Sequence, residues 1–296
     1  MTVLLPAIIP VAFIILIGFI GARALSLENK TLSQLTLYIL APALVADSLY
    51  RTTLSIQTSV GLVASFLITS LLLYLLAWGL GKICKLPEPS QKSLITSTLF
   101  PNNGNLGLPV SAFVFNTPGL ERAVVYMITS CLLMFGIGPA LLKGSGISFG
   151  IRLTLKLPLF WAMLGGLSLR LLSVELPLRL DEGIQQLGAA AIPVALIILG
   201  MQLASTRFEV GIYEICAASL RLLGGPAIAY IVGKFLQLEG LDLQVLVLQS
   251  AMPTAISTIV LVPFGGDAPR LARTVVVSTL MSFVTLPLVL WVLVSS

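Results

Sequence analysis

The sequence predicts an all-α, polytopic membrane protein of ten transmembrane helices, arranged as two inverted repeats of five helices each. Three observations predict this fold class. Hydrophobic residues make up 57% of the 296 residues and charged residues only 10%, whereas a soluble domain carries about 25% charged residues. The apolar residues form runs of about 20 residues, the length that crosses the bilayer core. Prolines recur at matching places in the two halves of the chain.

The apolar runs, cut at charged and turn residues, divide the chain into ten spans. In order they are residues 4–22, 32–49, 58–81, 92–115, 121–142, 154–172, 184–204, 212–236, 243–264 and 269–294. The first run has no charge before Arg23 and no small-residue cleavage site, so we expect a retained helix and not a signal peptide. The connections are short, which leaves no room for a soluble domain. The first repeat is expected over residues 1–145 and the second over residues 150–296.

Basic residues are distributed unevenly over the connections between these spans. The odd-numbered connections hold most of the lysine and arginine residues, Lys82, Lys85 and Lys143 among them, whereas each even-numbered connection holds one or two. Cytoplasmic loops are enriched in these residues. We therefore expect the odd-numbered connections to be cytoplasmic, and both termini to lie on the non-cytoplasmic side of the cell membrane.

The repeat is visible in the prolines. Pro42 and Pro193 interrupt the second and seventh spans, and Pro101 and Pro253 interrupt the fourth and ninth. Pro101 follows Pro42 by 59 residues, and Pro253 follows Pro193 by 60 residues. Five spans is an odd number, so the second copy must enter the membrane in the opposite direction. Inverted repeats with helices broken at matching places are typical of secondary transporters, whose substrate site lies near the bilayer midplane.

The break in the fourth span is rich in polar groups. Pro101 removes a backbone donor, and Asn102, Asn103 and Asn105 bring amide groups that hydrocarbon cannot satisfy. Backbone this irregular is tolerated at membrane depth only against protein or a wet cavity. Two interpretations remain open: a proline kink whose asparagines bond the neighbouring backbone, or a substrate site where side chains and freed amides converge.

The ninth span offers the matching element, in which Gln249, Pro253 and Thr254 are the candidate binding residues. If the two breaks cross, two half-helix amino termini point toward one another. Each carries roughly half a positive charge, so an anion between them is favoured, whereas a cation would prefer the carbonyl ends. This arrangement predicts a carboxylate-like substrate.

Two charged side chains fall within or near spans. Arg221 lies inside the eighth span, where it could hold an anion, bond the carbonyls of a broken helix, or extend to the cytoplasmic surface. Asp47 lies near the outer end of the second span and is the one carboxylate available to a cation/proton antiporter or sodium-coupled symporter of the same fold, the alternative function. Small residues such as Gly61 and Ala64 would allow close packing within a protomer or between the two copies of a homodimer.

Several function classes are disfavoured. The chain has no histidine, and Cys84, Cys131 and Cys216 are scattered, so we expect no metal site, no disulfide and no cofactor. No basic run predicts nucleic-acid binding. No phosphate-binding GxxxxGK[ST] loop, HExxH or GxSxG motif is present, which argues against ATP-driven transport and against an enzyme.

The segments LFPNNGNLGLPV, ALIILGMQLA, LRLLGGP and LVLQSAMPTAIST, with the tail from FGGDAP to VTLPL, resemble the auxin efflux carrier family over essentially the whole chain. That family includes plant PIN-type carriers and bacterial permeases. The resemblance implies the fold of sodium/proton antiporters, with fourth and ninth helices crossing at proline, and organic acids such as auxin or malate as substrates. It also implies that Asn102 contacts the substrate carboxylate, that Gln249 and Pro253 form the ninth-helix crossover, and that Arg221 is the arginine of the eighth helix.

Two departures from the family pattern restrict what the resemblance implies. Plant members have a polar, asparagine-containing stretch at the start of the sixth helix, where this chain has Leu157-Pro158-Leu159-Phe160. This difference puts auxin itself in doubt. The connection from Lys143 to Lys156 is also too short to be the long hydrophilic loop of many plant members, so regulation by phosphorylation there is not expected.

Overall fold

The computed structural model describes residues 5–25, 27–143, 147–205 and 209–295. Within these ranges the chain is helical, and the only strand-like feature is an isolated bridge between Pro101 and Thr254. Among the described residues, six helices are long and apolar enough to cross a membrane: Asn29–Arg51, Ile56–Ile83, Asn103–Lys143, Pro177–Ser205, Ile212–Phe235 and Ala268–Leu293. Ile8–Ala24 and Pro158–Leu171 are shorter apolar helices. The prediction of an all-α membrane protein is confirmed.

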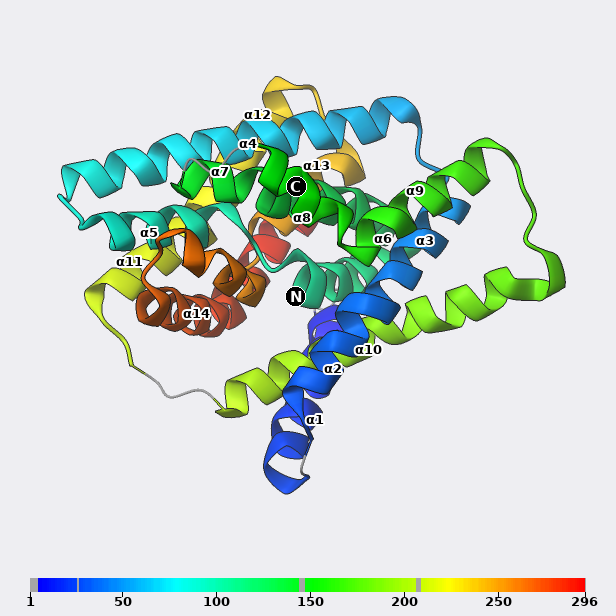
Figure 1. The fold of residues 1–296 in the computed structure, drawn as a ribbon, viewed down its shortest axis with the longest axis horizontal. Coiled ribbons are helices and arrows are strands. Elements are labelled where there is room, and N and C mark those ends of the chain that lie inside the picture. The colour runs from blue at the N-terminus through cyan, green and yellow to red at the C-terminus, as the bar shows by residue number, and fades with distance from the viewer. Residues whose placement is uncertain (1–4, 26, 144–146, 206–208, 296) are drawn as a thin grey trace.

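The elements follow one another as a series of helices with short connections (Figure 1). The α-helices are α1 (Leu5–Ala24), α2 (Asn29–Leu35), α3 (Ala41–Arg51), α4 (Ile56–Ile83), α5 (Glu88–Leu99), α6 (Leu108–Leu132), α7 (Gly138–Lys143), α8 (Ile147–Leu155), α9 (Pro158–Leu171), α10 (Leu180–Ser205), α11 (Ile212–Ser219), α12 (Gly225–Phe235), α13 (Gly240–Ser250) and α14 (Ala268–Ser295). Between them lie the π-helical segments η1 (Thr36–Leu40), η2 (Asn103–Gly107), η3 (Leu133–Ile137) and η5 (Leu220–Gly224), and the 3₁₀ segments η4 (Pro177–Arg179) and η6 (Ile256–Phe264).

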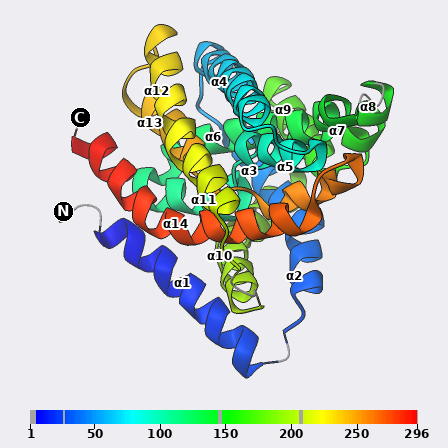
Figure 2. The ribbon, with the colours of Figure 1, turned by 90° about the vertical axis from the view of Figure 1, so that its left-hand side faces the viewer.

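The helices form two packed groups. In the first group, α1 lies along α10, and α3 packs against α9 and α10. In the second group, α4 packs against α5, α6 and α12, while α13 packs against α6 and α12, and α14 against α11. Figure 2 shows α1 and α10 toward one side of the molecule and α4, α12 and α13 toward the other. The groups meet where α10 contacts η2, and where α1 and α10 contact α6.

Glycines allow α1 and α10 to pack backbone to backbone. A side chain at Gly18 would meet the main chain of Ile197, whose Cα would lie 2.7 Å from the new Cβ. On the facing helix, a Cβ at Gly200 would lie 2.7 Å from the main-chain nitrogen of Phe19. Because lipid tails are as apolar as these side chains, close van der Waals packing of this kind is what holds membrane helices together.

The prolines predicted to break the second and seventh spans do not break them. Pro42 follows the π-helical segment η1 at the second residue of α3, and α10 continues through Pro193 without interruption. A π turn is widened by one residue and so accommodates a proline, which clashes with the preceding turn and has no N–H to donate. The same sequence of π turn and proline recurs at Pro109, Pro139 and Pro226.

Three predicted spans have different boundaries in the structure. The fourth and fifth spans meet inside α6. Asn116 has non-helical dihedral angles there (φ 55°, ψ −156°), which divide this element into two helical segments. Residues of the sixth span belong to α8 and α9, with Pro158 at the start of α9. A proline is well placed there, because the first helical N–H has no partner within the helix.

Candidate functional site

The two predicted breaks lie side by side near the centre of the second group of helices. The chain is extended between α5 and η2, and again between α13 and η6, and Pro101 and Thr254 form an antiparallel bridge there. Two hydrogen bonds flank the bridge, from the Asn102 N–H to the Pro253 carbonyl (2.7 Å) and from the Ala255 N–H to the Phe100 carbonyl (2.9 Å). We call this pair of segments, residues 100–102 and 251–255, the crossover. Four of the sequence candidates belong to it: Pro101, Asn102, Pro253 and Thr254.

The crossover satisfies the carbonyl group that proline leaves without a partner. In a continuous helix the carbonyl of Ser97 would accept from residue 101, but Pro101 has no N–H. The Thr254 hydroxyl takes its place and donates to the Ser97 carbonyl at 2.9 Å, and the Thr254 N–H donates to the hydroxyl of Ser278 at 3.1 Å. Thr254 is fully buried. Its contacts are therefore structural and hold one broken helix against the other.

Asn102 begins the second arm of the broken helix. Its side-chain oxygen accepts from the N–H of Asn105 at 3.3 Å, as the N-cap of the helix that starts at Asn103. Asn103 itself is buried, and neither polar atom of its side chain has a partner within the described residues. A buried amide without partners is costly. Asn103 therefore has hydrogen-bonding capacity that a bound polar molecule or water would satisfy.

Gln249 joins the two broken helices from the ninth span. Its side-chain nitrogen donates to the carbonyl of Gly107 at 2.9 Å and to the hydroxyl of Ser111 at 2.8 Å. The side-chain oxygen is buried and has no partner in the described part of the chain. A Cβ on Gly107 would lie 3.1 Å from the Gln249 nitrogen and closer still to the oxygen. Gly107 is therefore the residue that makes room for this link.

We expect Gly107→Ala to displace Gln249 and to lower both the unfolding midpoint and the transport rate. The added methyl group has no free volume, and overpacking of this kind typically costs about 1–3 kcal/mol. The matched control is Gly104→Ala, because a Cβ at Gly104 meets only the Met127 sulfur, at 3.7 Å. Thermal unfolding of both purified variants checks the prediction, which fails if the two unfold at the same temperature.

Arg221 approaches the crossover from a third helix. It lies in η5, it is 1% exposed, and its two terminal nitrogens donate to the main-chain carbonyls of Thr98 and Ser250. Of the roles predicted for Arg221, bonding to the carbonyls of broken helices is the one that the structure shows. It lines neither of the two cavities described next.

A cavity of about 300 Å³, including its mouth, lies where the first group of helices meets the second arm of the broken helix. Asn105 and Gly104 line it from that arm, and Thr36 lines it from η1, with a buried hydroxyl that has no partner within the described residues. Its remaining walls are apolar and comprise Ala41, Leu44, Leu108, Met127, Ala191, Ile192 and Ala195. We call this the Asn105 cavity. Of the residues predicted to bind substrate, only Asn105 lines it.

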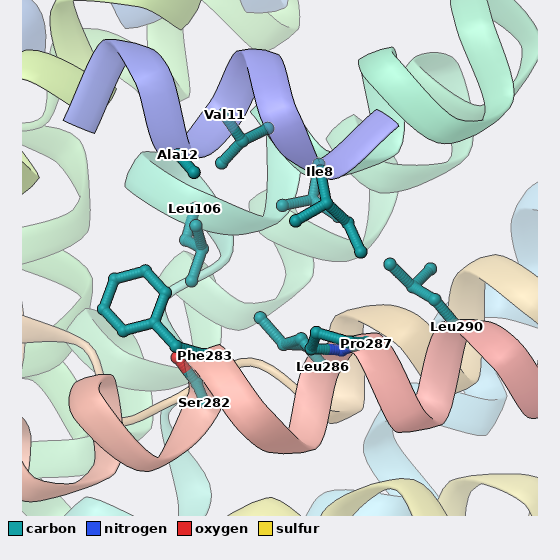
Figure 3. A pocket seen from close by; sticks show the side chains of 10 residues that line it. Ile8, Val11, Ala12, Leu106, Ser282, Phe283, Leu286, Pro287 and Leu290 are labelled. Atoms are coloured by element: carbon teal, nitrogen blue, oxygen red, sulfur yellow. The ribbon is translucent and has the colours of Figure 1, made fainter. Parts of the chain in front are cut away.

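A second cavity lies on the other side of the same helical arm, between α1 and α14 (Figure 3). It measures about 440 Å³ including its mouth. Ile8 and Val11 face it from α1, Leu286 and Leu290 from α14, and Leu106 from η2 (Figure 3). Ser282 is its one polar lining residue among those described. We call this the apolar cavity, since it offers almost nothing to a charged group.

The acidic candidate Asp47 lies elsewhere. Its carboxylate pairs with Arg51 at 2.8 Å, and Arg51 also pairs with Asp181 at 2.7 Å. Asp47 and Asp181 line a separate small cavity between α3, α9 and α10. Among the described residues, no group of three or more His, Cys, Asp or Glu side chains is arranged to hold a metal ion.

Comparison with known proteins gives consistent results. The family described as "Membrane transport protein" matches residues 3–153 and 145–291. An "Uncharacterized transporter" of Methanothermobacter thermautotrophicus is 29% identical over 290 residues, 95% of each chain. A "Putative malonate transporter" of Rhizobium meliloti is 24% identical, covering 94% of this chain and 92% of the relative. The "Uncharacterized transporter YfdV" of Escherichia coli is 26% identical, covering 97% and 96%.

Proposed function

The chain belongs to the membrane transport protein family, and we propose that it is a permease for a small organic carboxylate. Its membership of the family confirms the resemblance to auxin efflux carriers. It is a transporter and not an enzyme. The proposed substrate binds in the Asn105 cavity and crosses the bilayer by alternating access. The alternative, a cation/proton antiporter, has less support, because Asp47 is paired with Arg51 away from the crossover.

The observation that carries the proposal is the helical arm that begins beside the Asn105 cavity. Helix amino termini carry roughly half a positive charge and unpaired N–H groups, which favour anions. Gly104 lines the cavity, and its N–H has no acceptor among the described residues. The buried hydroxyl of Thr36 and the side chain of Asn105 add hydrogen-bonding groups for carboxylate oxygens.

The walls of the cavity support a substrate with an apolar body. Apart from Thr36, Gly104 and Asn105, every lining residue has an aliphatic or thioether side chain. Ligand sites commonly combine such walls with a few convergent polar groups. A carboxylate head against the helical arm and a hydrocarbon body against these walls would match both features. The malonate named for one relative is a small carboxylate with a single methylene group, so it matches the first feature and not the second.

We further propose that ten segments cross the bilayer, as two inverted repeats over residues 1–145 and 150–296, with both termini on the non-cytoplasmic side. The apolar stretch Asn103–Lys143 spans 41 residues, about twice the length that one crossing requires, and Asn116 divides it. Each broken helix is long enough to cross when its two arms are taken together. The bridge between Pro101 and Thr254 lies where the fourth and ninth segments of such a repeat would meet.

The proposal predicts that Ala41→Leu abolishes carboxylate binding in a folded protein. Leucine at this position adds three carbons to the wall of the Asn105 cavity. The matched control is Ala12→Leu, which adds the same atoms to the apolar cavity. Malonate, malate and indole-3-acetate would be screened by thermal unfolding, since a ligand of the folded state raises the midpoint. Stabilisation of wild type and Ala12→Leu, but not of Ala41→Leu, is expected. Equal stabilisation of all three proteins would contradict the site.

A further inference from the structure

The broken helices α5 and α13 end at the crossover with carbonyl groups that no helical N–H can reach. The Thr98 carbonyl would accept from the N–H of Asn102, but that N–H donates to the carbonyl of Pro253 at 2.7 Å. The Ser250 carbonyl would accept from Thr254, whose N–H donates instead to the Ser278 hydroxyl. The pairing that builds the crossover therefore leaves two main-chain carbonyls at the carboxyl ends of two helices.

Arg221 satisfies both carbonyls with one side chain. One terminal nitrogen of its guanidinium group donates to Thr98 and the other donates to Ser250. The arginine lies in a π-helical segment, a distortion that is frequent at functional sites. Glycine follows at position 225, where a Cβ would collide with the Ser250 carbonyl and the guanidinium group. The helix is therefore shaped around this contact.

The positive charge of Arg221 is balanced without an acidic residue. Among the described residues, no aspartate or glutamate forms an ion pair with Arg221. Each helix carboxyl end carries roughly half a negative charge, so α5 and α13 together present about one. One buried guanidinium balances them. In transporters built on broken helices, the carboxyl ends of half-helices are where coupling cations bind.

We propose that Arg221 is the resident cation of the crossover and occupies the position in which a transporter of this architecture would otherwise bind a coupling cation. The chain then needs no sodium ion to complete its site. The helical arm that starts at Asn103 still offers the Gly104 N–H to an anion in the Asn105 cavity, so this inference rests on the proposed function for its consequence in transport. Its structural part, a cation requirement met by Arg221, is independent of the substrate.

Cation rescue of Arg221→Ala tests the structural part. Thermal unfolding of the purified full-length protein would be measured in sodium, guanidinium and choline chlorides at equal, low millimolar concentrations. Wild type is expected to unfold at the same temperature in all three salts. Arg221→Ala is expected to unfold several degrees lower in choline, and to regain part of that loss, saturably, in guanidinium or sodium. A wild type stabilised by sodium, or a variant that no cation rescues, would overturn the proposal.

Two further variants separate the effect of charge from that of hydrogen bonding. They test the role of Arg221 as a cation even if Arg221→Ala does not fold. Arg221→Lys keeps the charge, and Arg221→Gln keeps donor groups without charge. The lysine variant is expected to be the more stable of the two. A glutamine variant as stable as wild type would show that the charge has no role.

Uptake of radiolabelled malonate into proteoliposomes tests the consequence for transport. Equal rates in sodium and choline are expected of wild type, and stimulation by sodium would overturn the proposal. Absence of malonate, malate and indole-3-acetate transport would instead count against the proposed function alone, because the unfolding measurements need no substrate.

Discussion

Asn102→Ala is expected to abolish carboxylate transport while leaving a protein that folds and inserts. Asn102 is the N-cap of the helical arm that borders the Asn105 cavity, and its side-chain oxygen accepts from the Asn105 N–H. Removing an N-cap side chain typically costs about 1 kcal/mol of stability, too little to unfold most proteins. The loss of function would follow from a frayed arm, which no longer aims its N–H groups at the substrate. Initial rates of malonate uptake at equal protein content measure the effect, and at least about a hundredfold loss is expected if an aligned polar contact is worth about 3 kcal/mol.

A second N-cap provides the control. The hydroxyl of Ser55 accepts from the N–H of Thr58 at 3.0 Å, at the exposed start of α4 and in contact with neither cavity. Ser55→Ala therefore removes the same kind of hydrogen bond at a similar cost in stability. We expect it to transport like wild type. If both variants lose transport in proportion to their stability, the role assigned to Asn102 is wrong.

The crossover was largely predictable from sequence, because it depends on residue types with strong backbone preferences. Proline removes an N–H wherever it occurs, and polar amides beside a proline in an apolar run are difficult to place except against protein or water. Breaks at matching positions left open whether the two segments cross, and the resemblance to auxin efflux carriers implied that the fourth and ninth helices cross at proline. The bridge between Pro101 and Thr254 and the bond from Asn102 to Pro253 place these segments together.

The partners of the crossover residues were not predictable, because they depend on three-dimensional register. Nothing in the sequence pairs Thr254 with the carbonyl of Ser97, or identifies Ser278 as its acceptor. Thr36 is one threonine near the start of an apolar run, and only the packing of η1 brings it to the Asn105 cavity. For the same reason, the sequence did not determine which groups the Arg221 side chain contacts. Which carbonyls it meets depends on how three separate helices pack.

The least reliable prediction was that each of these prolines breaks its helix. The pattern at Pro42 and Pro193 is the same as at Pro101 and Pro253 in type and spacing, yet the first pair lies in unbroken helices. Proline alone does not end a membrane helix, because a π turn or neighbouring groups can satisfy the carbonyls that it leaves. At Pro101 the neighbouring asparagines and the facing segment offer the backbone better partners than its own helix does.

Gly18→Leu is expected to have the largest effect on folding of any single substitution considered. Gly18 packs directly on the main chain of Ile197, and Gly200 on the facing helix packs on the main chain near Ile15 and Phe19. A side chain can move aside, but the backbone of a membrane helix cannot without losing hydrogen bonds that lipid does not replace. The cost should lie at or above the upper end of the range for overpacking, about 3 kcal/mol, and α1 would separate from α10. The yield of monodisperse protein after detergent extraction, with its unfolding midpoint, measures the loss.

Gly165→Leu is the matched control for this substitution, since a Cβ at Gly165 meets no atom within 4 Å. It makes the same change within an apolar helix on a surface that faces outward, so general effects of leucine on insertion and expression are shared by both variants. We expect Gly165→Leu to be extracted and to unfold like wild type, and Gly200→Leu to behave like Gly18→Leu because it opens the same interface from the other side. If Gly18→Leu were as stable as Gly165→Leu, α1 and α10 would not be packed backbone to backbone. The first group of helices could then not act as the rigid wall that the Asn105 cavity requires.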